Sequence, residues 1–306
     1  MKAASGHNSV LVVDVKRNSL DDGPGIRSVV FFKGCTLRCV WCQNPEALSP
    51  RAQIQLRPER CLGCGECTQA CPEQIAGTPE ETERTKDCRV CAACVAACPA
   101  GARRVAGVHY EADELFELLA KDEPFYRNSG GGVTLSGGEP AMYPAFACEL
   151  ARLLRARGIQ VLIETAGHID WADFERHLLP NIDAVYFDLK LADSAAHKRY
   201  VGVGNERILE NLRKIAVSGF CNLLCRVPLV PGITDTKENL QGIAELLLTN
   251  GLERVALLPY NPLWISKRLA LGMDLPYRHE ALMSPEQVAR CKQVFEEAGI
   301  TVVVAH

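Results

Sequence analysis

Three cysteines near the start of the chain have a spacing that could hold a reactive iron-sulfur cluster. Cys35, Cys39 and Cys42 are separated by three and then by two residues. A four-iron cluster bound by four thiolates is saturated and can only carry electrons, whereas three thiolates leave one iron with open coordination sites. The spacing therefore predicts a 4Fe-4S cluster that binds a substrate at its open iron. Structural thiols, or half of a zinc site, are the alternative interpretation.

Two further cysteine runs have the spacing of a bacterial two-cluster ferredoxin. Each run has four cysteines separated by two, two and three residues, and the last cysteine precedes a proline. In that arrangement the first three cysteines of a run bind one cluster and the fourth binds the other. Structural zinc is the alternative, although zinc ribbons do not use this doubled pattern. The predicted ligand sets are Cys61, Cys64, Cys67 and Cys98 for one 4Fe-4S cluster, and Cys88, Cys91, Cys94 and Cys71 for the other.

The segment that contains these two runs is predicted to be an insert. Residues 49–107 are rich in cysteine, proline, glycine and short charged pieces and show little apolar periodicity, so the two clusters must supply much of the cohesion. The sequence therefore divides into residues 1–48, with N-terminal strands and the first cysteine loop, the ferredoxin-like insert 49–107, and the remaining strands and helices in 108–306.

Outside the insert, strand and helix patterns alternate. Amphipathic helical spacing recurs around residues 146–154, 208–215 and 288–295. Six strand-helix units imply an α/β fold with a parallel sheet, either wound open or closed as a partial barrel, with its sites at the carboxyl ends of the strands. Residues 302–304 are a further candidate strand, and the six predicted strands end near Phe32, Leu135, Glu164, Asp188, Pro228 and Pro259.

Glycines and charged residues follow several of these predicted strands. Gly137 and Gly138 have no Cβ and let the backbone approach a ligand, and Glu139 supplies a carboxylate for an ammonium group. Asp188 and Lys190 fall on the same side of an extended strand end. An ordinary strand-to-helix turn and a purely structural Asp-Lys ion pair are the alternatives.

Together these motifs resemble the radical S-adenosylmethionine (SAM) enzymes, which have the same cysteine spacing with an aromatic residue before the third cysteine, here Trp41. The resemblance implies a partial (β/α)6 barrel in which the amino and carboxylate groups of SAM chelate the open iron. It also implies that one electron from the cluster splits SAM into methionine and a 5′-deoxyadenosyl radical. Glu164 and Thr165 could line the same pocket, and the SAM-binding residues implied by the resemblance are Trp41, Gln43, Gly137, Gly138, Glu139, Asp188, Leu189, Lys190, Arg226 and Asn261.

One of these positions departs from the pattern of the resembled enzymes. Many of them have a histidine where this chain has Asn261. Asparagine can donate and accept hydrogen bonds but cannot carry a proton at neutral pH. We therefore expect Asn261 to contact SAM without any acid-base role.

Two more segments narrow the resemblance to the activating enzymes of glycyl radical enzymes. They are residues 22–31, which lead into the first cysteine loop, and residues 126–132, which lead into the Gly-Gly-Glu turn. This resemblance covers essentially the whole chain. It implies that the deoxyadenosyl radical abstracts hydrogen from a backbone glycine of a partner glycyl radical enzyme, with flavodoxin or ferredoxin as electron donor.

The insert bears on the partner and on the path of the electron. The activating enzyme of pyruvate formate-lyase lacks such an insert, so the resemblance favours dehydratase, decarboxylase, carbon-nitrogen or carbon-sulfur lyase, or fumarate-adding partners. We expect the two extra clusters to relay electrons to the first cluster. A structural or docking role for the insert is the alternative.

Two other functions remain open at this point, a radical SAM enzyme that acts on a small molecule and a non-enzymatic electron carrier. The net charge of −3 and the lack of a basic block do not suggest nucleic-acid binding. No apolar run reaches 18 residues, and the apolar stretch at residues 10–13 is interrupted by Asp14, so neither a transmembrane helix nor a secretory signal is expected. Free thiols and exposed clusters favour a reduced cytoplasm.

Overall fold

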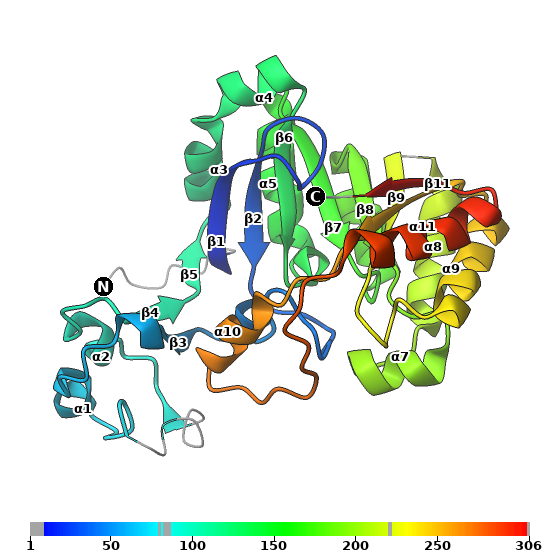
Figure 1. Cartoon of the computed structure of the whole chain (residues 1–306). Coiled ribbons are helices and arrows are strands. Elements are labelled where there is room, and N and C mark those ends of the chain that lie inside the picture. Colours follow the sequence, from blue (N-terminus) through cyan, green and yellow to red (C-terminus); the bar gives the residue numbers. More distant parts are fainter. Residues whose placement is uncertain (1–8, 79–80, 82–86, 220–221, 305–306) are drawn as a thin grey trace.

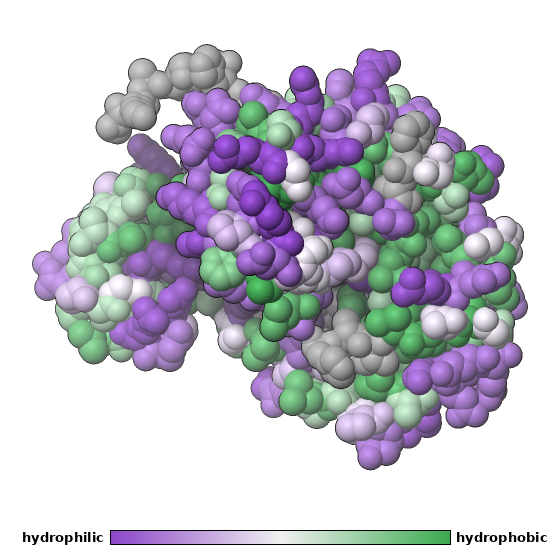
Figure 2. Space-filling model, turned by 90° about the horizontal axis from the view of Figure 1, so that it is seen from above, coloured by the Kyte–Doolittle hydropathy of each residue, from purple (hydrophilic) through white to green (hydrophobic). Residues whose placement is uncertain are grey.

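The computed structural model describes residues 9–78, 81, 87–219 and 222–304. Most of them form a large sheet with helices outside it, as Figure 1 shows. The described part of residues 53–106, which is rich in cysteine, forms a smaller lobe at the lower left of that view. Seen from above, this lobe protrudes beside the main body, and its surface mixes hydrophilic and hydrophobic residues (Figure 2).

The large sheet contains nine strands within the described residues. They are β1 (Val10–Ser19), β2 (Arg27–Phe32), β5 (Val108–Tyr110), β6 (Gly132–Gly137), β7 (Gln160–Thr165), β8 (Ala184–Asp188), β9 (Asn222–Pro228), β10 (Arg254–Leu258) and β11 (Thr301–Val304). Their order is β11-β10-β9-β8-β7-β6-β2-β1-β5. Neighbours from β2 to β11 are parallel, whereas β1 is antiparallel to both β2 and β5. The edge strands β11 and β5 do not pair, so the sheet is open.

This topology confirms the mostly parallel α/β sheet that the sequence predicts. The six predicted strands are β2, β6, β7, β8, β9 and β10, and the candidate at residues 302–304 is β11. The sheet is larger than the expected six strands because β11 extends one edge and the antiparallel strands β1 and β5 extend the other.

The parallel strands lie deep in the molecule, covered by other elements. In β2, Val29, Val30 and Phe32 are fully buried, and Val133 and Leu135 of the adjacent β6 are buried as well. Parallel strands covered on both faces read as nearly continuous apolar runs, which is the pattern that predicted them. The polar residues that end these strands therefore emerge at one edge of a rigid sheet.

The longer helices outside the sheet bury one apolar stripe each, as the sequence pattern predicts. Phe146, Leu150 and Leu154 are buried on α5, and Leu212 and Phe295 are buried on α8 and α11. The α-helices of this part of the chain are α3 (Ala112–Ala120), α4 (Glu123–Ser129), α5 (Pro144–Ala156), α6 (Trp171–Asp173), α7 (Ser194–Val201), α8 (Glu206–Ser218), α9 (Lys237–Thr249), α10 (Trp264–Leu269) and α11 (Pro285–Glu297). Shorter turns are η1 (Pro45–Ala47), η4 (Pro140–Met142), η5 (Phe174–Leu178) and η6 (Leu179–Asn181).

A pair of strands forms the base of the smaller lobe. β3 (Gln53–Leu56) and β4 (Arg103–Ala106) are antiparallel, and between them lie η2 (Pro58–Arg60), α1 (Glu66–Ala70) and α2 (Ala93–Ala96). Neither strand is among those predicted from the sequence, although β3 alternates polar and apolar residues as a strand does. β3 leads from the large sheet into the lobe, and β4 leads from the lobe back to the sheet.

A search of the described helices for a membrane span found none of sufficient length and apolar character.

Candidate functional site

The loop after β2 carries the first cysteine motif and is held from two sides. Gly34 begins it with a φ of 116°, a conformation open chiefly to glycine. The backbone N–H of Arg38 donates to the carbonyl of Val201 at 2.8 Å, and that of Val40 donates to Tyr200 at 3.0 Å. The loop is therefore fixed along the end of α7, at the carboxyl edge of the sheet.

The three cysteines of this loop are close neighbours in a dry environment. Cys39 is buried, and Cys35 and Cys42 are half-buried. Burial raises the pKa of the Cys35 thiol to about 12, and burial, together with the neighbouring Cys39 and Cys35, raises the pKa of Cys42. Such thiols stay protonated alone, whereas iron binding would displace their protons. The chemistry of this donor set thus suits three thiolate ligands.

The spacing of the thiols differs from that of a mononuclear metal site. Among the described residues, no three His, Cys, Asp or Glu side chains are gathered closely enough to hold one metal ion. In a cubane each thiolate binds a different iron, so its ligands stand farther apart than the ligands of a single ion.

The Gly-Gly-Glu turn touches the backbone of the cysteine loop. A Cβ on Gly138 would lie 2.0 Å from the carbonyl oxygen of Gly34, so no side chain fits there. Gly137 has a φ of 97°, and a Cβ on it would meet the backbone of β2 at 2.7 Å. The two glycines thus bring the end of β6 against the residue that precedes Cys35.

Glu139 is buried and its carboxylate accepts three hydrogen bonds. Oε2 accepts from Thr165 Oγ1 at 2.9 Å and from the Ala166 N–H at 3.1 Å, and Oε1 accepts from the Ala141 N–H at 3.3 Å. Burial raises the pKa of Glu139 to about 7 despite these bonds. Oε1 retains a lone pair for one more donor, such as an amino group.

Four parallel strands contribute to a buried charge network at the same edge. Arg226 of β9 is ion-paired with Asp188 at the end of β8, at 2.8 Å, and with Glu164 of β7. Ser136 of β6 donates to Glu164 at 2.6 Å, and Lys190 is ion-paired with Asp188 at 3.3 Å. The structure therefore brings together these predicted site residues, including the Asp-Lys pair that had a purely structural alternative.

The charge network lies beside the cysteine loop. Burial lowers the pKa of Lys190, but Asp188 and the nearby Cys39 outweigh it and hold that pKa above its ordinary value. Burial alone would raise the pKa of Asp188, yet Arg226 and Lys190 hold it below its ordinary value. The site thus keeps fixed, ionised groups of both signs next to the cysteines.

The other predicted SAM-binding residues have structural contacts here. Trp41 and Leu189 belong to the hydrophobic core, and the backbone N–H of Leu189 donates to the Arg226 carbonyl at 2.8 Å. Gln43 Nε2 donates to the Asn261 carbonyl at 3.1 Å, and Asn261 Oδ1 accepts from the Leu263 N–H at 3.3 Å. Gln43 and Asn261 therefore join the cysteine loop to the segment after β10.

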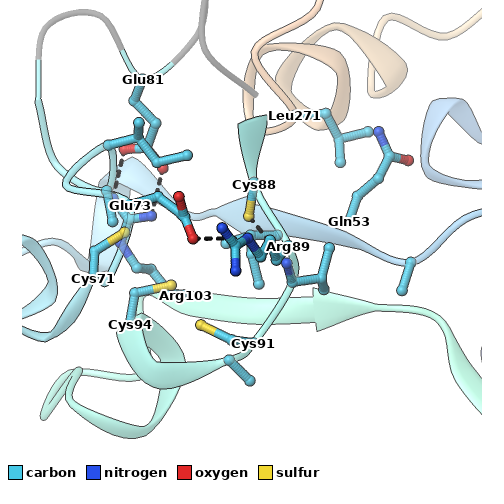
Figure 3. A pocket seen from close by; sticks show the side chains of 16 residues that line it. Gln53, Cys71, Glu73, Glu81, Cys88, Arg89, Cys91, Cys94, Arg103 and Leu271 are labelled. Carbon is cyan, nitrogen blue, oxygen red and sulfur yellow. Dashed lines mark hydrogen bonds and ion pairs between the residues drawn. The ribbon is translucent and has the colours of Figure 1, made fainter. Parts of the chain in front are cut away.

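The insert cysteines line two pockets in crossed sets. The larger pocket, of about 250 Å³, is lined by Cys71, the fourth cysteine of the first run, together with three cysteines of the second run. In Figure 3 the labelled sulfur atoms of this pocket point toward one another. The smaller pocket, of about 30 Å³, has the fourth cysteine of the second run. The lining sets are Cys71, Cys88, Cys91 and Cys94 for the larger pocket and Cys61, Cys64, Cys67 and Cys98 for the smaller.

Backbone N–H groups favour the thiolate form of Cys71 and Cys98, the fourth cysteines of the two runs. Burial opposes ionisation, but hydrogen bonds from the backbone N–H groups of residues 73–76 together outweigh it and hold the pKa of Cys71 below its ordinary value. The N–H of Ala102 donates to Cys98 Sγ at 3.3 Å, and the pKa of Cys98 is lowered in the same way. These donors suit thiolates that carry the negative charge of a cluster.

Comparison with known proteins assigns the family. The model of the radical SAM superfamily matches residues 29–247. The indoleacetate decarboxylase activating enzyme of Tractidigestivibacter scatoligenes is 34% identical over 316 residues, covering 99% of this chain and 100% of that protein. The isethionate sulfite-lyase activating enzyme of Oleidesulfovibrio alaskensis is 38% identical over 275 residues, covering 87% and 88%. The chain belongs to the radical SAM superfamily, among the glycyl-radical-enzyme activating enzymes.

A solved radical SAM structure adds a likeness of fold alone. SuiB of Streptococcus suis, bound to its precursor peptide SuiA, superposes with a TM-score of 0.51 at 14% identity, covering 65% of this chain and 43% of that one. Membership of the radical SAM superfamily implies a 4Fe-4S cluster and SAM. The three-cysteine loop described above fits that cluster.

Gly138→Ala should displace the cysteine loop of this radical SAM enzyme. The new methyl group would collide with the Gly34 carbonyl, so the backbone next to Cys35 must move. We expect SAM affinity to fall at least about tenfold, because a shift of about 1 Å in a reacting group can already lower the rate of an enzyme about 100-fold. Equilibrium binding of SAM to the anaerobic, reconstituted protein measures this. Gly251→Ala is the control: its φ of 69° makes alanine strained there, but its Cβ meets nothing within 4 Å, so equal losses in both variants would contradict the prediction.

Sequence reasoning missed a buried cation beside the loop. Lys33 is fully buried, and its Nζ donates to the Glu46 carbonyl at 2.5 Å and to Gln53 Oε1 at 2.9 Å. It thus joins the end of β2 to the first residue of β3. The feature of the sequence that could have indicated this buried lysine is its position directly after an apolar strand and before Gly34.

Proposed function

We propose that the protein activates a glycyl radical enzyme by reductive cleavage of SAM. When bound, the cluster supplies one electron, which splits SAM into methionine and a 5′-deoxyadenosyl radical; the radical takes a hydrogen atom from a backbone glycine of the partner and becomes 5′-deoxyadenosine. The observation that carries the proposal is the meeting of the three-cysteine loop, the Gly-Gly-Glu turn and the Asp188 network at one edge of the sheet. The names of the relatives, all activating enzymes, support it.

The residues of this edge have separate proposed roles. Cys35, Cys39 and Cys42 hold the cluster and leave one iron open. Gly137 and Gly138 let the backbone approach SAM, and Glu139 Oε1 accepts a hydrogen bond from its amino group. The positive amino group would also favour the ionised form of this buried carboxylate, whose pKa burial raises to about 7.

Cations of the charge network are proposed to orient the SAM carboxylate. Lys190 and Arg226 are nearly buried and already neutralised in part by Asp188 and Glu164. A guanidinium and an ammonium together offer eight N–H donors, of which the ion pairs described here use only some. A new carboxylate can therefore bind without displacing the existing pairs.

The insert is proposed to hold two further 4Fe-4S clusters that relay electrons from flavodoxin or ferredoxin. The crossed cysteine sets and the backbone donors to Cys71 and Cys98 support this. The lobe exposes Cys61, Cys64 and Cys91, so a donor protein can come close to either set. Such clusters would be stable in a reduced cytoplasm, where we place the protein.

The test combines reduced, reconstituted protein, SAM and anaerobic extract of the native host, read by electron paramagnetic resonance (EPR) and by deoxyadenosine yield. We expect a glycine-centred doublet only when all components are present. Mass spectrometry of the oxygen-cleaved partner then locates the glycine. Deoxyadenosine without the doublet would favour a small-molecule substrate instead. Absence of both, with no effect of SAM on the cluster spectrum, would contradict the radical SAM mechanism and leave only electron transfer.

A further inference from the structure

Arg103 lies between the two cysteine pockets of the insert. It is the first residue of β4, it is only 4% exposed, and it lines both pockets. A buried arginine is unusual because it cannot lose its proton, so its charge needs partners inside the protein. Figure 3 shows the side chain beside Cys71 and Cys94.

The guanidinium reaches one cysteine of each set. It lines the larger pocket together with Cys94 and the smaller pocket together with Cys67, and its charge acts on both thiols. The position where Gly77 would carry a Cβ lies 3.1 Å from Cys67 Sγ and 3.9 Å from Arg103 Nη2, so both groups border the same small space. A single positive charge therefore faces both pockets.

Glu81 fixes the orientation of this arginine. Its two carboxylate oxygens accept from Arg103 Nη1 at 2.5 Å and from Nη2 at 2.6 Å, and Oε2 also accepts from the Gly77 N–H at 2.7 Å. A bidentate pair of this kind sets the plane of the guanidinium. Two of its five N–H donors are used in this way, and three remain for the sulfur atoms on either side.

We propose that Arg103 is a positioning residue shared by the two cluster sites of the insert, whose fixed positive charge raises the reduction potentials of both clusters together. This inference rests on the proposed function, which places a cluster in each pocket. Each cluster gains one electron from the donor protein, and so one negative charge, when it is reduced. Charge and hydrogen bonds around the sulfur atoms set such potentials. One cation facing both clusters favours both reduced forms and shifts the two potentials in the same direction.

The test is a potentiometric titration of the anaerobic, reconstituted full-length protein, followed by EPR. Signals that do not respond to SAM belong to the insert. In Arg103→Gln we expect both insert clusters to be reduced about tenfold less favourably, a shift of about 59 mV to lower potential for a one-electron couple. A shift of only one cluster would overturn the shared role.

Arg104→Gln is the matched control. Arg104 is the next residue, carries the same charge, and bonds through Nε to Gln55 without lining either pocket. We expect its insert potentials to equal those of the wild type. Equal shifts of the insert potentials in R103Q and R104Q, or no shift in R103Q, would show that Arg103 has only a structural role.

Glu81→Gln changes the local charge in the opposite direction to Arg103→Gln. It removes a negative charge and keeps the arginine itself, so we expect both insert potentials to rise. If R103Q fails to retain its clusters, this variant decides: a rise supports the inference, and unchanged or lower potentials overturn it.

Iron and labile sulfide in the wild-type protein separate the two proposals. Iron for three clusters, with no shift in the variants, rejects the role of Arg103 and leaves the proposed function intact. Iron for one cluster rejects the insert clusters themselves, and the inference about Arg103 with them.

Discussion

Cys39→Ala should abolish SAM cleavage with every reductant. Cys39 is the buried member of the first cysteine set, and without it only two thiolates remain in that loop. Loss of a residue that hydrogen-bonds to a metal ligand lowers metal affinity or activity about 10- to 100-fold. Loss of a ligand itself should therefore lower SAM cleavage more than about 100-fold. The deoxyadenosine yield under anaerobic conditions measures this. The EPR signals of the insert should remain, because its eight cysteines are unchanged.

Cys91→Ala is the matched control for this prediction. Cys91 is an exposed member of the larger insert pocket. If the insert relays electrons, this variant should fail with flavodoxin or ferredoxin and still cleave SAM with a strong chemical reductant. Equal activity with both kinds of donor would favour a structural or docking role. Cleavage by the Cys39 variant with a chemical reductant would contradict the assignment of the first cysteine set.

The sheet and its polar edge could be predicted because the relevant signals are local in sequence. The parallel strands are short apolar runs, and Cys35, Glu139 and Asp188 each follow one of them closely. Carboxyl ends of parallel strands share one edge, so sequence order alone places these residues together. The cysteine spacing likewise carries its own geometry.

The rest depends on contacts between distant segments. The antiparallel strand β5 has three residues, and its pairing with β1 is specified by the folded sheet. Arg226 was expected to face SAM, yet its pairing with both Glu164 and Asp188 requires the register of three neighbouring strands. Nothing near Arg103 in the sequence shows that Glu81 and two cysteine sets surround it in the fold.

Arg226→Met should destabilise the protein and weaken SAM binding together. The arginine is 8% exposed, and its loss leaves two partly buried carboxylates with fewer partners. Breaking a buried ion pair by removing one member costs about 3–5 kcal/mol. We expect a lower midpoint of anaerobic thermal unfolding. Arg226→Lys should restore it only in part, because an ammonium cannot bridge both carboxylates with the same geometry.

The pH dependence of this loss has a definite sign. In the wild type the depressed pKa of Asp188 gives stability that is present above the unfolded value of about 4 and is lost as the pH falls through the folded value. Without Arg226, burial should raise that pKa, so the folded variant binds more protons than the unfolded chain and loses stability as the pH rises. The difference in unfolding midpoint between wild type and variant should therefore grow from pH 5 toward pH 8.

The control is an arginine at the opposite end of a neighbouring strand. Arg254 begins β10 and is exposed, so Arg254→Met removes the same charge away from the network. We expect a change within about 0.5 kcal/mol, as for most surface substitutions, and unchanged SAM affinity. If R226M and R254M behaved alike, or if the R226M defect were greatest at low pH, Arg226 would not be the group that keeps Asp188 ionised beside the cysteine loop.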